Sequence, residues 1–403
     1  MNVTIAPQQT VGTVAAPPSK SAAHRLLIGA GLCHHQTSVI HGIDLSEDIS
    51  ATLDCLRALG AVCRVEGTTV TVTGTDPRRA AGAVLPCRES GSTLRFFIPL
   101  ALLGTEETVL RGSETLLSRP LGIYRELCET QGLLFRPSAT EVTVKGTLSA
   151  DTFTISGNIS SQFITGLLFA LPLLKQDSII RLLPPIESRS YIDLTLAALR
   201  QFGVTAAWQA EDTLVIRGGQ TYSAAEVTVE GDYSNAAFFE ALNVLGGRVT
   251  VTGLSEPSLQ GDRVYRKHFA CLKQGYATID LADCPDLGPI LFAVAAGAHG
   301  ALFQNTRRLQ LKESNRAHVM AEELRKFGAV VTVEENTVTV LPGDFHAPQE
   351  PLCGHNDHRI VMSLSVLATK TGGTIYGAEA VRKSFPGFFE ALQTLGAEVH
   401  YAE

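Results

Sequence analysis

Lysines, arginines and serines recur in this chain at points where long apolar segments begin. Three such points lie in the first half, and they carry Lys20, Ser21 and Arg25 in PPSKSAAHR, Gly91 and Arg95 in ESGSTLRF, and Ser160, Ser161 and Gln162 in GNISSQF. If each apolar segment is a helix, its first backbone N–H groups lack partners and its dipole favours an anion. A single serine there is equally typical of an N-cap. The recurrence with embedded cations favours a shared anion site, provided that the three helices are roughly parallel.

A second set of charged residues lies in the other half of the chain. It comprises Asp286, Lys312, Glu313, Arg316, His358, Arg359 and Lys383. Arginine pairs bidentately with carboxylate or phosphate, and a carboxyl group beside it can transfer protons. These residues therefore predict a site for a small polyanion with acid–base chemistry. The alternative is a solvated helix face, which is our interpretation of Glu322 and Lys326.

His355, Asp357 and His358 are residue types that bind metals, because imidazole and carboxylate are common ligands. The adjacent Arg359 would repel a cation, so we expect no metal at this segment. The chain also lacks a G-x-x-x-x-G-K-[ST] loop, a G-x-G-x-x-G fingerprint and an H-E-x-x-H motif. We therefore predict neither a metal nor an organic cofactor.

An internal repeat must position these residues. Six glycines each follow a helical pattern and precede a strand-like run: Gly60, Gly132, Gly203, Gly275, Gly328 and Gly396, at intervals, by subtraction, of 72, 71, 72, 53 and 68 residues. The apolar segments begin near Ser19, Ser90, Ser160, Tyr233, Asp286 and Asn356, at intervals of 71, 70, 73, 53 and 70. Both series shorten between their fourth and fifth members, so one repeat unit underlies both.

Each repeat is predicted to contain a buried helix, a strand, an amphipathic helix and a β-hairpin. Glycine after the second helix suits a left-handed position at a helix C-terminus. Six such βαβαββ units indicate an α/β fold of two pseudo-symmetric domains with three units each. We expect the boundary near Val227–Gly231, and a second crossing near Pro17 and Pro18 if the first strand belongs to the second domain.

The composition of the 403 residues, 45% hydrophobic and 18% charged, is typical of a folded globular protein. The net charge of −7 argues against electrostatic binding to nucleic acid or to an anionic membrane. The longest apolar runs contain Gly or Pro and are too short to cross a bilayer. The first residues show no targeting pattern, so a cytoplasmic location is expected. We interpret the eight cysteines, which include no C-x-x-C pair, as reduced thiols, and Trp208 as a core residue.

Nine motifs, in one order along nearly the whole chain, resemble those of the enolpyruvyl transferase family, in the branch that acts on shikimate 3-phosphate. They are PPSKSAAHR, ESGSTLRF, LLSRPL, SSQF, ESRSYID, EGDYSNAAFF, RLQLKESNR, NDHRI and KSFPGFF. The resemblance implies two inside-out α/β barrel domains that close over a cleft. Residues 19–228 would form the shikimate-phosphate side, and residues 1–18 with 229–403 the acid–base and phosphoenolpyruvate side. We also expect a monomer.

The resemblance further implies transfer of the carboxyvinyl group of phosphoenolpyruvate to the 5-hydroxyl of shikimate 3-phosphate, on the pathway to chorismate and aromatic amino acids. Shikimate 3-phosphate would be bound by Lys20, Ser21, Arg25, Ser160, Ser161, Gln162, Ser188, Tyr191, Asp286 and Lys312. Phosphoenolpyruvate would be bound by Lys20, Gly91, Arg95, Arg119, Gln162, Arg316, Arg359 and Lys383. Asp286 would accept the hydroxyl proton and Glu313 would protonate the methylene carbon. Lys20, expected at an exposed helix tip, would also act in catalysis.

Two positions depart from the family pattern: Glu89 and Arg308 stand where members often have Asn, so their ligand contacts stay open. The family branch that acts on UDP-N-acetylglucosamine is an alternative. It typically has Asn after the first-motif lysine and a loop cysteine, whereas this chain has Ser21 and no cysteine in SETLLSRPLG. A non-catalytic phosphosugar-binding protein is a second alternative, but it would not need Asp286 and Glu313.

Overall fold

The computed structural model describes residues 1–79 and 82–402. Within it the chain divides into two compact units, each with its own apolar core. One unit is Lys20–Val229, which we call the N-terminal unit. The other, the C-terminal unit, combines Met1–Ser19 with Glu230–Glu403. The first strands of the chain therefore belong to the unit that also holds its end.

The N-terminal unit contains three consecutive α/β repeats. Its helices are α1 (Lys20–Gly31), α2 (Glu47–Ala58), α3 (Gly91–Ala101), α4 (Glu114–Leu117), α5 (Gly122–Thr130), α6 (Ser161–Ala170) and α7 (Arg189–Gln201). Its strands are β3 (Thr37–His41), β4 (Val62–Glu66), β5 (Thr69–Thr73), β6 (Val84–Arg88), β7 (Thr108–Gly112), β8 (Leu134–Pro137), β9 (Glu141–Lys145), β10 (Thr152–Ser156), β11 (Ser178–Leu183), β12 (Ala206–Ala210), β13 (Thr213–Ile216) and β14 (Glu226–Thr228).

The C-terminal unit is built in the same way. Its helices are α8 (Tyr233–Leu242), α9 (Tyr265–Gln274), α10 (Gly288–Gly297), α11 (Arg316–Arg325), α12 (His358–Thr371) and α13 (Phe388–Thr394). Its strands are β1 (Asn2–Ile5), β2 (Val11–Ala15), β15 (Arg248–Thr252), β16 (Ala277–Asp280), β17 (Ala301–Gln304), β18 (Val330–Val333), β19 (Thr337–Leu341), β20 (Leu352–Cys353), β21 (Gly373–Tyr376) and β22 (Val399–Ala402). Short 3-10 helices include η3 (Gly261–Val264), η4 (Pro285–Leu287), η5 (Arg307–Leu311) and η6 (Ala378–Lys383).

The sheets of the repeats share one strand order. In the N-terminal unit the orders are β14-β3-β5-β4, β6-β7-β9-β8 and β10-β11-β13-β12. In each, the first pair is parallel and the strands of the hairpin are antiparallel. The C-terminal unit repeats the order in β16-β17-β19-β18. The predicted α/β repeat is thus confirmed.

The first two strands complete two sheets of the C-terminal unit. β1 pairs antiparallel with both β21 and β22, so it supplies the second hairpin strand of the last repeat. β2 pairs parallel with β15 in a two-stranded sheet. Among the described residues, the fourth repeat passes from α9 directly to β16 and has no hairpin. A hairpin in every repeat was therefore a wrong expectation, and its omission explains the interval of 53 residues.

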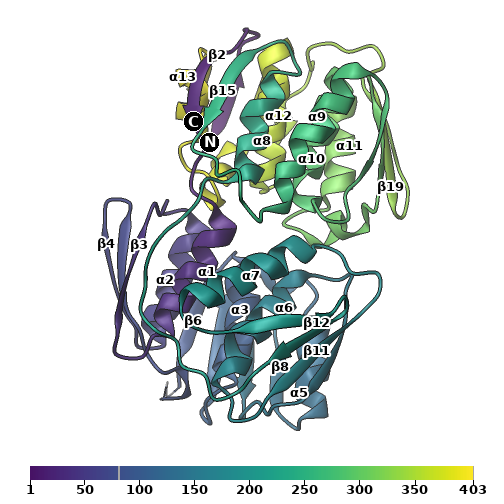
Figure 1. The fold of residues 1–403 in the computed structure, drawn as a ribbon. Coiled ribbons are helices and arrows are strands. Elements are labelled where there is room, and N and C mark those ends of the chain that lie inside the picture. Colours follow the sequence, from purple (N-terminus) through teal and green to yellow (C-terminus); the bar gives the residue numbers. More distant parts are fainter. Residues whose placement is uncertain (80–81, 403) are drawn as a thin grey trace. The chain divides into compact units, whose positions relative to one another are not determined.

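The first helix of each repeat is buried because it is apolar nearly all round. In α10 every residue from Gly288 to Ala296 is buried. Figure 1 shows α8, α10 and α12 side by side within the C-terminal unit, and α10 packs against both of the others. The second helices end as predicted at five glycines with φ between +67° and +100°. Gly275 differs, because its φ of 164° is extended backbone.

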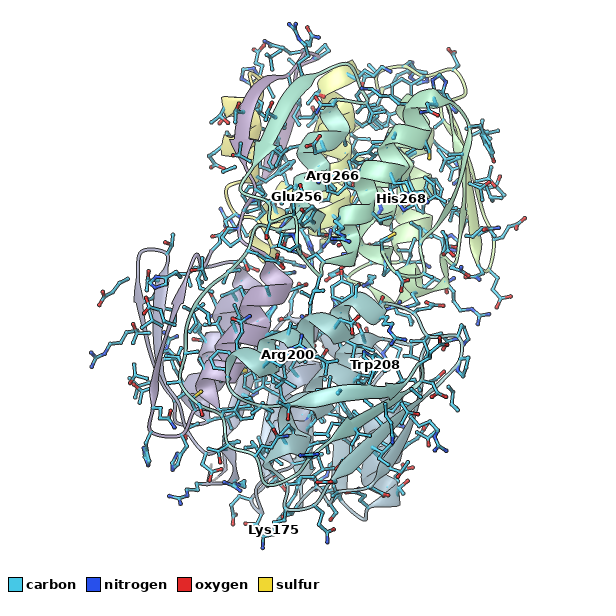
Figure 2. The ribbon with its side chains drawn as sticks, in the orientation of Figure 1. Lys175, Arg200, Trp208, Glu256, Arg266 and His268 are labelled. Carbon is cyan, nitrogen blue, oxygen red and sulfur yellow. The ribbon has the colours of Figure 1, made fainter. Side chains whose placement is uncertain are left out.

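Several expectations about single residues can be compared with the structure. None of the described helices is long and apolar enough to cross a membrane. All eight cysteines are free thiols. Trp208 lies on β12 (Figure 2) and is partly buried, packed against the core of the N-terminal unit, so it lies at the edge of that core. Its Nε1 donates to Asp193 over 2.8 Å, and the Arg189 guanidinium lies 4.0 Å from the ring centroid.

Candidate functional site

The polar residues at the start of α3 and α6 cap these helices and also bring two cations together. Ser90 Oγ accepts from the backbone N–H of Thr93, and Ser160 Oγ accepts from that of Gln162. The N-cap interpretation of both serines is therefore correct. It does not exclude anion binding, because each cap satisfies one of the four free N–H groups at a helix start.

Gly91 is the first residue of α3 and lies against two guanidinium groups. A Cβ atom at this position would be 2.9 Å from Arg119 Nη1 and 3.3 Å from Arg95 Nη1, so a side chain would displace them. Arg95 Nη1 donates to Gln162 Oε1 over 2.6 Å, and Gln162 Nε2 donates to Ser92 Oγ over 3.0 Å. The structure therefore gathers Gly91, Arg95, Arg119 and Gln162 at one place, where an anion would meet two cations and a helix N-terminus.

Arg25 is a buried cation that has no carboxylate partner among residues 1–79 and 82–402. Its side chain donates to Thr195 Oγ1, to the Tyr191 carbonyl and to the Ser21 carbonyl over 2.9, 3.1 and 2.7 Å. No carboxylate of the described chain lies within ion-pair distance of it. Burial lowers its pKa to about 10, which leaves it charged at neutral pH. An uncompensated buried charge is costly, so a ligand anion would stabilise this arrangement.

The sequence analysis placed Lys20 at an exposed helix tip, and this prediction was wrong. Its side chain is 15% exposed and its Nζ lies 2.7 Å from Asp48 Oδ2, whose side chain is 10% exposed. Sequence reasoning missed Asp48, which lies in the first turn of α2. The other predicted residues of this unit are placed near helix starts. Ser161 opens α6, Ser188 precedes α7 with a left-handed φ of 55°, and Tyr191 is in the first turn of α7.

Asp286 is the centre of a charged network in the C-terminal unit. Its Oδ1 lies 3.0 Å from Lys312 Nζ and 2.9 Å from Arg316 Nη1, and its Oδ2 lies 3.5 Å from Arg359 Nη2. Burial tends to raise the pKa of Asp286, but the charges of Lys312, Arg359 and Arg316 together hold it well below its usual value. Asp286 is therefore an ionised carboxylate that could accept a hydrogen bond or a proton from a ligand hydroxyl.

Arg316 joins this carboxylate to two others. Its side chain is 1% exposed, and its Nη2 donates to Glu313 Oε2 over 2.6 Å. Its Nε donates to Asp357 Oδ2 over 2.9 Å. Asp357 is also the N-cap of α12, because its Oδ1 accepts from the Arg359 backbone N–H. Lys383, in η6, donates to the Asn356 carbonyl over 2.7 Å. The predicted cluster of the second half is thus brought together, with Asp357 as an addition.

Two of the three suggested metal residues contact other side chains, and the third is buried. Asp357 accepts from Arg316, His355 Nε2 lies 2.9 Å from Glu323 Oε1, and His358 is buried. Lys326, interpreted from sequence as a solvated charge, instead pairs with the buried Glu323, whereas Glu322 is exposed as expected.

The two positions that depart from the family pattern differ in burial. Arg308 is buried and donates to the Ala282 carbonyl over 3.3 Å, while Glu89 is partly buried directly before Ser90.

Asp262, in η3, is a buried carboxyl group that the sequence analysis missed, because the polar residues around it are typical of an exposed loop. Burial, and then the charge of Asp286, raise its pKa to about 6, and the charge of Arg359 opposes them. Because this pKa is above the unfolded value of 3.8, the folded state binds the proton more tightly. The contribution of Asp262 to stability must then fall as pH rises from about 4 to about 6.

We therefore expect Asp262→Asn to raise the melting temperature relative to wild type more at about pH 8 than at about pH 4. Asn cannot ionise, so the variant escapes the cost of a buried charge at high pH. Calorimetric scans of both proteins at the two pH values would measure the difference. An equal difference at both values would contradict the raised pKa of Asp262.

Comparison with known proteins supports one family. The family model described as EPSP synthase (3-phosphoshikimate 1-carboxyvinyltransferase) matches residues 5–392. A 3-phosphoshikimate 1-carboxyvinyltransferase of Clostridium kluyveri is 36% identical over 98% of both chains. One of Clostridium perfringens is 37% identical, again over 98% of both.

Two solved structures are similar over nearly their whole length. EPSP synthase from Acinetobacter baumannii has a TM-score of 0.78 and 23% identity, covering 99% of this chain and 100% of its own. The enolpyruvyl transferase NikO from Streptomyces tendae has a TM-score of 0.78 and 15% identity, covering 100% and 98%. At such identities these two structures show similarity of fold alone.

Proposed function

Because the chain belongs to the EPSP synthase (3-phosphoshikimate 1-carboxyvinyltransferase) family, we propose that it transfers the carboxyvinyl group of phosphoenolpyruvate to the 5-hydroxyl of shikimate 3-phosphate. Phosphate is the second product. The reaction belongs to the shikimate pathway, which leads to chorismate and the aromatic amino acids.

The network of Asp286, Glu313 and Arg316 is the observation in the structure that best supports this proposal. The reaction needs a base for the attacking hydroxyl and an acid for the methylene carbon, because protonating that carbon makes its neighbour electrophilic. Asp286 is ionised, as a base must be, and we propose that the bound substrates draw away the cations that lower its pKa, which makes it a stronger base. Glu313 lies 2.6 Å from Arg316 Nη2, a contact that favours its ionised form. We therefore propose that it takes up its proton only when the charge of the bound substrates and the loss of water offset this contact.

The atoms balance in two steps. In the first, the 5-oxygen bonds to the central carbon of phosphoenolpyruvate, its proton goes to Asp286, and Glu313 gives a proton to the methylene carbon. In the second, the bond from the central carbon to the phosphate oxygen breaks, and the departing phosphate takes the proton from Asp286. The new methyl group returns a proton to Glu313, which regenerates the carboxyvinyl double bond and both starting groups. Cations beside the leaving phosphate stabilise the charge that develops there.

The binding roles of the other residues are part of the proposal. Shikimate 3-phosphate is bound by Lys20, Ser21, Arg25, Ser160, Ser161, Gln162, Ser188, Tyr191, Asp286 and Lys312. Phosphoenolpyruvate is bound by Lys20, Gly91, Arg95, Arg119, Gln162, Arg316, Arg359 and Lys383. The buried charge of Arg25, which forms no ion pair within the described part of the chain, and the guanidinium pair beside Gly91 support these assignments, since each suits an anion. We propose that the enzyme acts as a cytoplasmic monomer with these two small anions as its partners.

The alternative substrate, UDP-N-acetylglucosamine, has less support. The relatives at 36% and 37% identity are 3-phosphoshikimate 1-carboxyvinyltransferases. Ser21 follows Lys20, and the segment 113–122 has no cysteine. A non-catalytic phosphosugar-binding role would leave the charged network around Asp286 and Glu313 without a purpose.

Turnover should be independent of metal ions. The side chains of lysine and arginine already neutralise two polyanionic substrates in this proposal, so a divalent cation has no required task. We expect the rate after treatment with EDTA to equal that of the untreated enzyme within assay error. A loss of activity that zinc or magnesium restores would contradict this prediction.

Complementation tests the proposed function in cells. In a bacterium that lacks its own enzyme for this step, the chain should restore growth without aromatic amino acids. The Glu313→Gln variant, expressed at the same level, should fail to do so. Absence of growth with the wild-type chain, despite confirmed expression of folded protein, would refute the proposal.

A further inference from the structure

A four-residue turn, Gly354 to Asp357, leads into α12 and has two consecutive non-glycine residues in the left-handed conformation. φ is 48° at His355 and 52° at Asn356. The Asp357 N–H donates to the Gly354 carbonyl over 2.9 Å. Positive φ at both central positions is the pattern of a type I′ turn, which favours Asn and Gly. Because a histidine there costs conformational free energy, other contacts must hold the turn.

Glu323 of α11 supplies these contacts from a fully buried side chain. Its Oε1 lies 2.9 Å from His355 Nε2, and its Oε2 accepts from the Cys353 backbone N–H over 2.9 Å. Burial tends to raise the pKa of Glu323, but hydrogen bonds from His355, Lys326 and Cys353 outweigh it and lower the pKa. The side chain is therefore a charged acceptor that fixes both the strand before the turn and the turn itself.

This turn also positions two groups that contact cations of the charged network, the Asp357 carboxylate and the Asn356 carbonyl. Arg316 Nε donates to Asp357 Oδ2 over 2.9 Å, and its Nη2 donates to Asp357 Oδ1 over 3.2 Å. Lys383 Nζ donates to the Asn356 carbonyl over 2.7 Å. Arg359 follows two residues later, in the first turn of α12. A shift of the turn would thus move the partners of two cations at once.

A metal ion is the other use that these side chains could have. Glu322, Glu323 and His355 offer ligand atoms within 4.8 Å of one another. However, Lys326 Nζ lies 3.0 Å and 2.9 Å from the two Glu323 oxygens, so an ammonium group already compensates this carboxylate. The contacts instead favour a structural role. The hydrogen bond between Glu323 and His355, which we call the tether, joins α11 to the turn.

We propose that Glu323 and His355 are positioning residues, whose hydrogen bond holds the turn so that Arg316 and Lys383 can bind phosphoenolpyruvate. This inference rests on the proposed function, because it takes from it the ligand of these two cations. Neither side chain is assigned any contact with a substrate. The effect of losing the tether should therefore appear in binding of one substrate, without removal of any reacting group.

Variants at His355 separate the tether from the backbone conformation. His355→Gly removes the imidazole but adopts positive φ without strain, whereas His355→Ala removes the imidazole and keeps the strain. Glu323→Gln removes the charged acceptor, and Glu322→Gln on the exposed side of the same helix is the matched control. We expect His355→Gly, His355→Ala and Glu323→Gln to raise the KM for phosphoenolpyruvate about tenfold or more, because small misplacements of binding groups are costly. The KM for shikimate 3-phosphate and the behaviour of Glu322→Gln should stay close to wild type.

Two results would overturn the inference. A His355→Gly enzyme with the wild-type KM for phosphoenolpyruvate would show that the tether has no positioning role. Variants that lose melting temperature and kcat, with KM unchanged for both substrates, would show a purely structural role.

Hydrogen exchange of residues 353–359, followed by mass spectrometry, is independent of activity. It should be faster in His355→Gly than in wild type and in Glu322→Gln. An unchanged exchange rate would refute the tether whether or not the chain is active, whereas an inactive wild-type chain would refute the proposed function.

Discussion

Replacing Glu313 with Gln is expected to reduce kcat by about 10²- to 10⁴-fold, the usual cost of removing a general acid or base. Gln retains the shape and can still accept a hydrogen bond from Arg316, but it cannot deliver a proton to the methylene carbon. Both substrates should therefore still bind, with KM values close to wild type. Steady-state kinetics with each substrate varied in turn would measure both effects.

Deuterium incorporation makes this test specific to the acid. In heavy water, the wild-type enzyme should introduce deuterium into the methylene group of the product, and Glu313→Gln should not do so at a comparable rate. Glu322→Gln, an exposed carboxylate on α11, is the control for loss of one negative charge. A Glu313→Gln enzyme that works within a few-fold of wild type and still incorporates deuterium would assign the acid to another group.

Lys20→Met is expected to lower kcat/KM by about 10²-fold or more, because the ammonium group is proposed to contact both substrates. The structure adds a second effect. Lys20 pairs with Asp48, and the variant leaves this nearly buried carboxylate without its cation. Removing one partner of a buried pair is destabilising, so the melting temperature should fall as well.

The double variant Lys20→Met/Asp48→Asn separates the two effects. It removes the unpaired charge along with the lysine, so the melting temperature should return toward the wild-type value while activity stays low. Differential scanning fluorimetry and initial rates on the same protein would show both. If activity returned together with the melting temperature, Lys20 would have only a structural role.

Much of the fold could be predicted because its signals are local. Apolar segments and glycines at regular intervals mark the helices of each repeat, and five of the six glycines adopt the expected left-handed conformation. The interval of 53 residues showed that the fourth repeat is shorter, but it did not show that the hairpin is the missing part. In this repeat β15 pairs with β2, which lies more than 230 residues away in the sequence. Pairing between such distant strands produces no periodic pattern that the sequence could reveal.

The site shows the same division. Serines, lysines and arginines at helix starts are visible in the sequence, because their types are unusual beside apolar text. Their counter-charges are not: Asp48 and Asp357 compensate Lys20 and Arg316 through contacts that span 28 and 41 residues. Lys20 was consequently expected to be exposed, and Asp357 was considered only as a metal ligand. Tertiary packing decides which carboxylate lies beside a buried cation. A sequence motif therefore identifies the cation, and the structure is needed to identify its partner.

The central claim is transfer of the carboxyvinyl group to shikimate 3-phosphate, and phosphate release tests it most directly. Purified enzyme would be incubated with phosphoenolpyruvate alone, with shikimate 3-phosphate added, and with UDP-N-acetylglucosamine added instead. We predict phosphate release only in the second mixture, with one carboxyvinyl ether formed for each phosphate. Release without an acceptor, or only with UDP-N-acetylglucosamine, would contradict the account.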